Sequence, residues 1–114
     1  MPTDPKLARW KLLTEHLLPA RARDLGWPVR LDHCFKRITL DHACNDLWTR
    51  HLPKPAQNHL TGPTLDRALA AAESLLTGDR SLLDQLNRRS LQHRGKLAPH
   101  LTLHPRSSKG RTTA

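Results

Sequence analysis

The residues of this chain whose side chains could do chemistry are concentrated between Trp27 and Trp48. This stretch holds both cysteines and two Asp-His pairs, at Asp32-His33 and Asp41-His42. Cysteine and histidine are the residue types that bind zinc, and a thiol beside a histidine is the usual arrangement for nucleophilic catalysis. If the protein has a catalytic or metal-binding site, we expect it in this stretch.

The spacing of the two cysteines argues against a shared metal ion or a disulfide. If Cys34 and Cys44 lie on one helix, a rise of about 1.5 Å per residue puts them roughly 15 Å apart. That separation is far too long for common ligation or an S–S bond, and only a hairpin in this segment would bring the two thiols together. We expect reduced thiols that pack as small apolar side chains, and we expect neither a metal ion nor a cofactor.

Nucleophilic catalysis needs a thiol with a base in reach. His33 and Cys34 are adjacent, so on a helix they point to different faces, whereas Asp41, Cys44 and Trp48 share one face. A catalytic cysteine would need a histidine from elsewhere, and the candidates are His16, His51 and His59. No residue is assigned as catalytic, and we favour a protein that is not an enzyme.

The charged residues of this stretch have two interpretations. Structurally, Asp32 with Lys36 and Asp46 with Arg50 are acid-before-base pairs four residues apart, and buried charges would tie the helix to other elements. The expected partners are Arg30, Asn87 and Arg88. Functionally, the polar side chains would converge on one pocket for a small ligand or a flipped base. The candidate pocket residues are Asp32, His33, Arg37, Asp41, Cys44, Asn45 and Trp48.

Charge is distributed unevenly along the chain. The formal net charge is +9. Residues 1–84 carry twelve Lys or Arg against ten Asp or Glu, whereas residues 85–114 carry seven Lys or Arg and no acid. A basic end of this kind commonly binds a polyanion, with nucleic acid the usual partner, but it is also compatible with a solvated tail that keeps the protein soluble. The candidate nucleic-acid contacts are Arg88, Arg89, Gln92, Arg94, Lys96, Arg106, Lys109 and Arg111.

Composition favours a single all-α domain. The chain has 114 residues, no Tyr and one Phe, and its apolar residues are mostly Leu and Ala, which favour helix over strand. It has no apolar run long enough to span a membrane and no signal-peptide pattern, so we expect a cytoplasmic protein that does not bind membranes. We expect a compact bundle of about four helices over residues 1–96, followed by a flexible basic tail over residues 97–114.

Apolar spacing and Pro/Gly positions place the expected helices. The first runs from Pro5 to about Leu18, and Pro19 ends it or opens a short turn through Asp24. The second covers residues 31–51 and is central and mostly buried, because its apolar stripe changes sides. A strand over residues 35–40 is the alternative.

The last two helices follow a proline-rich loop. The third helix begins at Gly62-Pro63 and ends near Gly78, and the fourth is capped by Ser81 and closed by Gly95. Disorder is expected from about Pro105 onward, because that composition cannot repay the entropy of ordering.

The Trp-Pro-Val-Arg-Leu-Asp-His-Cys-Phe sequence that begins at Trp27 resembles a block in a group of small bacterial proteins, some of which carry an acetyltransferase label. The resemblance extends through Trp48, residues 53–60, residues 86–91 and residues 94–96. An acetyltransferase would hold acyl-CoA on a Gln/Arg-x-x-Gly-x-Gly/Ala turn, and this chain has no such run. No catalytic residue is carried over from the resemblance.

Three function classes remain, in order of preference. The first is a small basic binding or accessory protein that contacts nucleic acid through its C-terminal helix and tail. The second is an enzyme or small-ligand-binding domain that uses the candidate pocket. The third is a protein-interaction subunit with an apolar face for a partner chain.

Overall fold

The computed structural model describes residues 4–95, and this part of the chain is all-α, as the composition predicted. Its helices are α1 (Pro5–Leu12), α2 (Leu18–Leu25), α3 (Asp32–Cys44), α4 (Gly62–Leu76) and α5 (Arg80–His93). A π-helical turn, η1 (Leu13–Leu17), joins α1 to α2, and two 3-10 turns, η2 (Trp48–Arg50) and η3 (Ala56–Asn58), lie between α3 and α4. The predicted basic tail, residues 97–114, lies outside the described residues.

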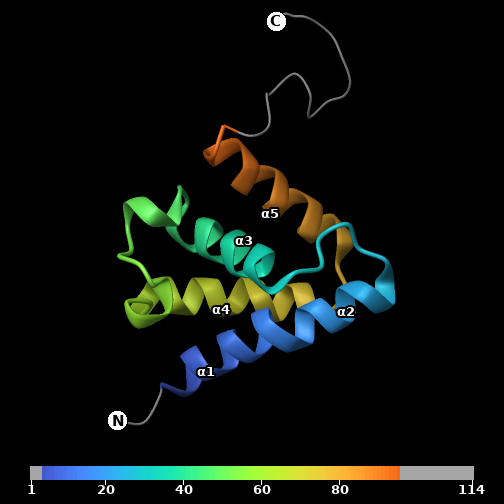
Figure 1. Ribbon diagram of the computed structural model, residues 1–114, viewed down its shortest axis with the longest axis horizontal. Helices are drawn as coiled ribbons and strands as arrows, with labels where there is room; N and C mark the ends of the chain where they lie inside the picture. The colour runs from blue at the N-terminus through green and yellow to red at the C-terminus, as the bar shows by residue number, and fades with distance from the viewer. Residues whose placement is uncertain (1–3, 96–114) are drawn as a thin grey trace, which may run out of the picture.

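Helix α3 is the central element, as the sequence predicted. It contacts α2, α4, α5, η1 and η2, and Figure 1 shows α5 on one side of it and α4 on the other, with α1 packed on α4. Phe35 and Ile38 are buried along one side of α3, and Leu40 and Ala43, nearly opposite, are buried as well. This burial on several sides explains why the apolar stripe changes face along the sequence.

The first helical rod does not end at Pro19; the alternative of a turn that continues through Asp24 is the correct one, because α2 runs from Leu18 to Leu25. In η1 the Leu18 N–H donates to the Leu13 carbonyl, one residue farther back than in an α-helix. This wide turn makes room for the proline ring, which would otherwise clash with the preceding turn, and Pro19 then sits at the start of α2. The rod ends at Gly26, which adopts a left-handed conformation with φ of 68°.

The central helix is shorter than predicted. It ends at Cys44 instead of continuing to His51, because Asn45 adopts a left-handed conformation with φ of 53° and ψ of 34°. The strand proposed as an alternative for residues 35–40 is also wrong, since these residues lie within α3. Helix α4 begins at the predicted Gly62-Pro63, whereas the cap of α5 is Asp79 instead of Ser81, with its side chain accepting from the Leu82 N–H.

The core combines leucine and aromatic side chains with two hydrogen-bonded threonines, Thr14 and Thr39. Trp10, Leu13, Phe35, Leu65 and Leu83 are among the fully buried side chains. The Trp10 indole N–H donates to Thr39 Oγ1 at 3.0 Å, and Thr39 Oγ1 in turn donates to the Phe35 carbonyl at 2.8 Å. These bonds tie α1 to α3 and satisfy the polar atoms that burial would otherwise leave unpaired.

Candidate functional site

Asp41 is the centre of a buried hydrogen-bond network that joins α3 to α5. Its side chain is 1% exposed, and each carboxylate oxygen accepts two hydrogen bonds. Oδ1 accepts from the Trp48 backbone N–H at 3.0 Å and from Arg94 Nη2 at 3.1 Å. Oδ2 accepts from Ser90 Oγ at 2.5 Å and from Arg94 Nε at 3.0 Å. With both oxygens occupied, Asp41 acts as a structural anchor and is poorly placed to take a proton from a substrate.

Arg37 extends this network toward α5. Its Nη1 donates to Ser90 Oγ at 2.8 Å, and its Nη2 donates to Asn87 Oδ1 at 2.9 Å. The expected tie between the central helix and Asn87 is therefore confirmed. Arg37 and Asp41 share the Ser90 hydroxyl and form no direct ion pair. Ser90 was not predicted, although a serine in the buried stripe that contains Leu83 and Leu86 is a signal for such a network.

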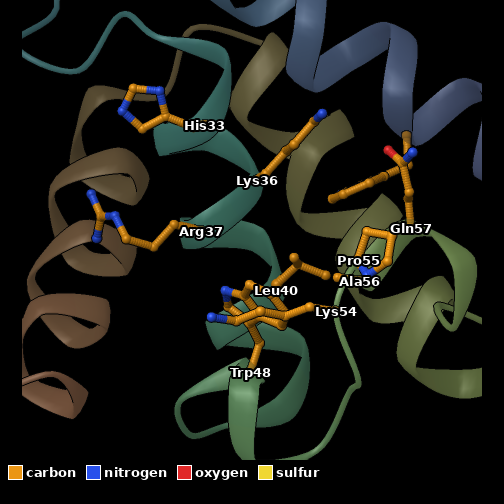
Figure 2. A pocket seen from close by; sticks show the side chains of 10 residues that line it. His33, Lys36, Arg37, Leu40, Trp48, Lys54, Pro55, Ala56 and Gln57 are labelled. Atoms are coloured by element: carbon orange, nitrogen blue, oxygen red, sulfur yellow. The ribbon is translucent and has the colours of Figure 1, made fainter.

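A pocket of about 420 Å³ lies beside the network. Figure 2 shows side chains from α3, from η2 and from the segment that follows it around this pocket. Trp10, Leu40, Trp48, Pro55 and Ala56 contribute apolar surface. The polar lining residues are His33, Lys36, Arg37, Lys54 and Gln57. The lining thus combines apolar surface with cationic groups, and no acidic residue takes part in it.

The predicted pocket is only partly assembled. His33, Arg37 and Trp48 line the pocket together. Asp32, Asp41, Cys44 and Asn45 do not line it, so their predicted convergence is wrong. Asp32 is exposed at the start of α3, Asp41 is enclosed by its four donors, and Cys44 and Asn45 lie where the helix ends. Lys54 and Gln57 were missed because they come from a loop whose packing has no periodic signal.

The predicted nucleic-acid contacts fall into three groups. Arg88, Arg89 and Gln92 are exposed on α5. Arg94 is engaged by Asp41, with its side chain 23% exposed, so it holds the fold together and is not free to bind phosphate. The remaining candidates, Lys96, Arg106, Lys109 and Arg111, lie outside the described residues.

The two cysteines are free thiols near opposite ends of α3, and both are half-buried. Burial raises the pKa of the Cys44 thiol, and the carboxylates of Asp41 and Asp46 raise it further, while Arg67 partly offsets them. A raised pKa keeps a thiol protonated and weakly nucleophilic. Among residues 4–95, no three His, Cys, Asp or Glu side chains are grouped so that they could hold a metal ion.

His42 lies where α3 meets a hollow between α4 and α5. This hollow is lined by Ala70, Ala71, Ser74, Leu82 and Leu86 as well as His42. Burial lowers the pKa of His42, and the positive charges of Arg89 and Arg67 lower it further. Two arginines therefore lie close to the imidazole, Arg89 of α5 and Arg67 of α4, and both disfavour its protonated form.

Comparison of the chain with known protein families, with curated proteins and with solved structures finds no match. The resemblance of the Trp27 block to small bacterial proteins therefore stays a prediction. Within residues 4–95, no helix combines the length and apolar character needed to cross a membrane.

Proposed function

We propose that this protein is a small helical binding protein of the cytoplasm that contacts nucleic acid through the exposed side of α5 and the basic end of the chain. One observation carries the proposal. Arg88 and Arg89 are exposed, and neither forms an ion pair with a carboxylate within residues 4–95. Two adjacent uncompensated guanidinium groups are suited to phosphate oxygens.

The carboxylates near this surface are already occupied. Asp84, one turn before Arg88, accepts from Arg80 at 2.9 Å. Asp41 is enclosed by Arg94 and Ser90, and Asp79 caps α5. Because these acids are engaged elsewhere, the positive charges of Arg88 and Arg89 are available to a polyanion.

Neighbouring residues extend the basic surface. Arg67 of α4 is exposed, with its Nε donating to the Ala43 carbonyl at 2.8 Å, and it lies near enough to His42 to shift that residue's pKa, as Arg89 does. Gln92 follows Arg88 by one helical turn and adds an amide that can bond to a phosphate or a base edge. The seven Lys or Arg after residue 84 face no acid in that part of the sequence.

Salt-dependent binding tests the proposal. Fluorescence anisotropy with labelled duplex and single-stranded DNA and RNA should show binding at about 50 mM salt that weakens steeply as salt rises. Arg88→Ala/Arg89→Ala should weaken duplex binding and reduce the slope of log K against log salt by about 2, since each lost phosphate contact contributes about 0.9. The basic end can be tested in the same way. We expect a triple variant, Arg106→Ala/Lys109→Ala/Arg111→Ala, to weaken duplex binding and to reduce the salt slope as well.

Arg21→Ala/Arg23→Ala is the matched control, because both arginines are exposed on α2 and their removal lowers the net charge by the same amount. This control should retain most of the wild-type affinity. Equal losses in both double variants would mean that only net charge matters and would contradict an α5 interface. Absence of salt-sensitive binding near about 50 mM salt would contradict the whole proposal.

The other two function classes have less support. A cysteine enzyme would need its thiol in the pocket, and neither Cys34 nor Cys44 lines the pocket beside α3. A protein-interaction subunit would need a continuous apolar surface. The large apolar side chains exposed within residues 4–95 are Leu12, Leu25 and Leu31, which lie at the end of α1, at the end of α2 and before α3.

A further inference from the structure

The pocket beside α3 has an uneven charge distribution. Its lining includes Lys36, Arg37 and Lys54 but no Asp or Glu. Lys36 is neutralised, because its Nζ lies 2.8 Å from Glu15 Oε2. Figure 2 shows Lys36 and Arg37 leaving α3 in different directions, consistent with the contact of Lys36 with η1 and of Arg37 with α5.

Arg37 and Lys54 keep positive charges that a ligand could use. Arg37 donates to the neutral oxygens of Ser90 and Asn87, which orient the guanidinium without cancelling its charge. Asp41, the nearest acid in this network, is itself compensated by Arg94. Lys54 is exposed and forms no ion pair within residues 4–95.

The rest of the lining is suited to an apolar body. Leu40 and Ala56 are buried and Trp48 is half-buried, and Trp10 and Pro55 complete the apolar surface. An indole and a proline ring present flat faces, against which a planar group packs well. The size of about 420 Å³ falls in the range of small-molecule sites.

The buried network positions two of these residues. The Trp48 backbone N–H donates to Asp41 Oδ1, and Ser90, which donates to Asp41, also accepts from Arg37. One buried carboxylate thus helps to fix both an aromatic wall and a cationic group, and such preorganisation lowers the cost of binding. Trp48 and Arg37 are therefore already held in place before a ligand binds.

We propose that this pocket binds a small organic anion, in which a planar apolar body lies against Trp48, Pro55 and Leu40 and a carboxylate or phosphate lies near Arg37 and Lys54. The site is separate from Arg88 and Arg89 and does not depend on nucleic-acid binding. Occupation by an anion satisfies the uncompensated charges, whereas a cation of the same shape is repelled.

The test uses the full chain and four naphthalene probes: 2-naphthoate, 2-naphthyl phosphate, naphthalene-2-methanol and naphthalene-2-methylamine. Calorimetric titration should show that at least one anion binds, with a dissociation constant below about 1 mM, about tenfold more tightly than the neutral alcohol, and that the amine binds most weakly. The tighter of the two anions identifies the head group. In NMR spectra the indole N–H signal of Trp48, assigned with Trp48→Phe, should shift, while that of buried Trp27 should not.

Lys54→Ala should weaken binding of the preferred anion by about tenfold without unfolding the chain, because Lys54 is exposed. Lys11→Ala, on α1 and outside the lining, is the matched control and should bind as the wild type does. Equal binding of anion and alcohol, equal effects of the two lysine variants, or an unmoved Trp48 signal with both anions would each overturn the proposal.

Discussion

Asp41 of α3 and Arg94, the residue that follows α5, form a two-pronged ion pair, with Arg94 Nε 3.0 Å from Asp41 Oδ2 and Arg94 Nη2 3.1 Å from Asp41 Oδ1. An arginine that sequence reasoning assigned to nucleic acid is therefore a half-buried structural residue. The pair fastens the last turn of α5 to the central helix. The exposed Arg88 and Arg89 are thereby held on a rigid element.

Removing this anchor should destabilise the protein strongly. Asp41→Ala leaves Arg94, Ser90 and the Trp48 N–H without their acceptor, and breaking a buried ion pair from one side costs about 3 kcal/mol or more. Asp84→Ala removes a carboxylate from the exposed pair with Arg80 and should cost less than about 1 kcal/mol. Urea unfolding of both variants measures the difference. Similar losses in the two would contradict the anchoring role of Asp41.

The fold class and the clearest helix could be predicted because their signals are local. In α4 the buried Leu65, Ala68, Ala72 and Leu75 follow helical spacing, and Gly62-Pro63 marks the start. A continuation through Asp24 is one of two alternatives at Pro19, but the π-helical turn at Leu13–Leu17 that accommodates the proline has no local sequence signal. A proline that usually ends a helix is tolerated here through a widened turn.

The end of α3 should depend on the left-handed conformation of Asn45. A side chain with a Cβ resists this conformation by roughly 1–2 kcal/mol, asparagine less so, and glycine not at all. Asn45→Ala should therefore lower the free energy of unfolding by about 1 kcal/mol, whereas Asn45→Gly should stay within about 0.5 kcal/mol of the wild type. Both variants remove the same exposed amide, so thermal or urea unfolding isolates the backbone effect. If the alanine variant is as stable as the glycine variant, the left-handed cap is not what ends the helix.

Sequence reasoning found part of the pocket and missed the rest for a physical reason. Arg37 and Trp48 were expected from their place in the central stretch, and both line the pocket. Continuing the helix through Asn45 placed Asp41, Cys44 and Trp48 on one face, whereas the actual helix end turns Trp48 away and brings its N–H to Asp41. Lys54 enters through a loop contact that no periodicity encodes.

The stability of the protein should fall on acidification through the titration of His42. Its pKa in the folded state is lowered by burial and by Arg89 and Arg67, so the folded protein binds fewer protons than the unfolded chain below about pH 6.5. The stability that the folded protein has with His42 neutral is therefore fully present above about pH 6.5 and is lost as the pH falls toward the folded-state pKa of His42. Urea unfolding of His42→Gln should show an unfolding free energy that depends less on pH than that of the wild type between about pH 7 and pH 5. An unchanged slope in His42→Gln would show that another group governs this range.

The Cys44 thiol should be less acidic in the folded protein than in the unfolded chain. Burial and the Asp41 and Asp46 carboxylates disfavour its thiolate, and only Arg67 opposes them. In a Cys34→Ser background, the pH at which iodoacetamide labelling of Cys44 reaches half its maximal rate should be higher in buffer than in concentrated urea. This midpoint reports the pKa separately from accessibility, which changes only the maximal rate. A lower midpoint in the folded protein would instead identify an activated thiol, and it would restore the hypothesis of a cysteine enzyme that the raised pKa argues against.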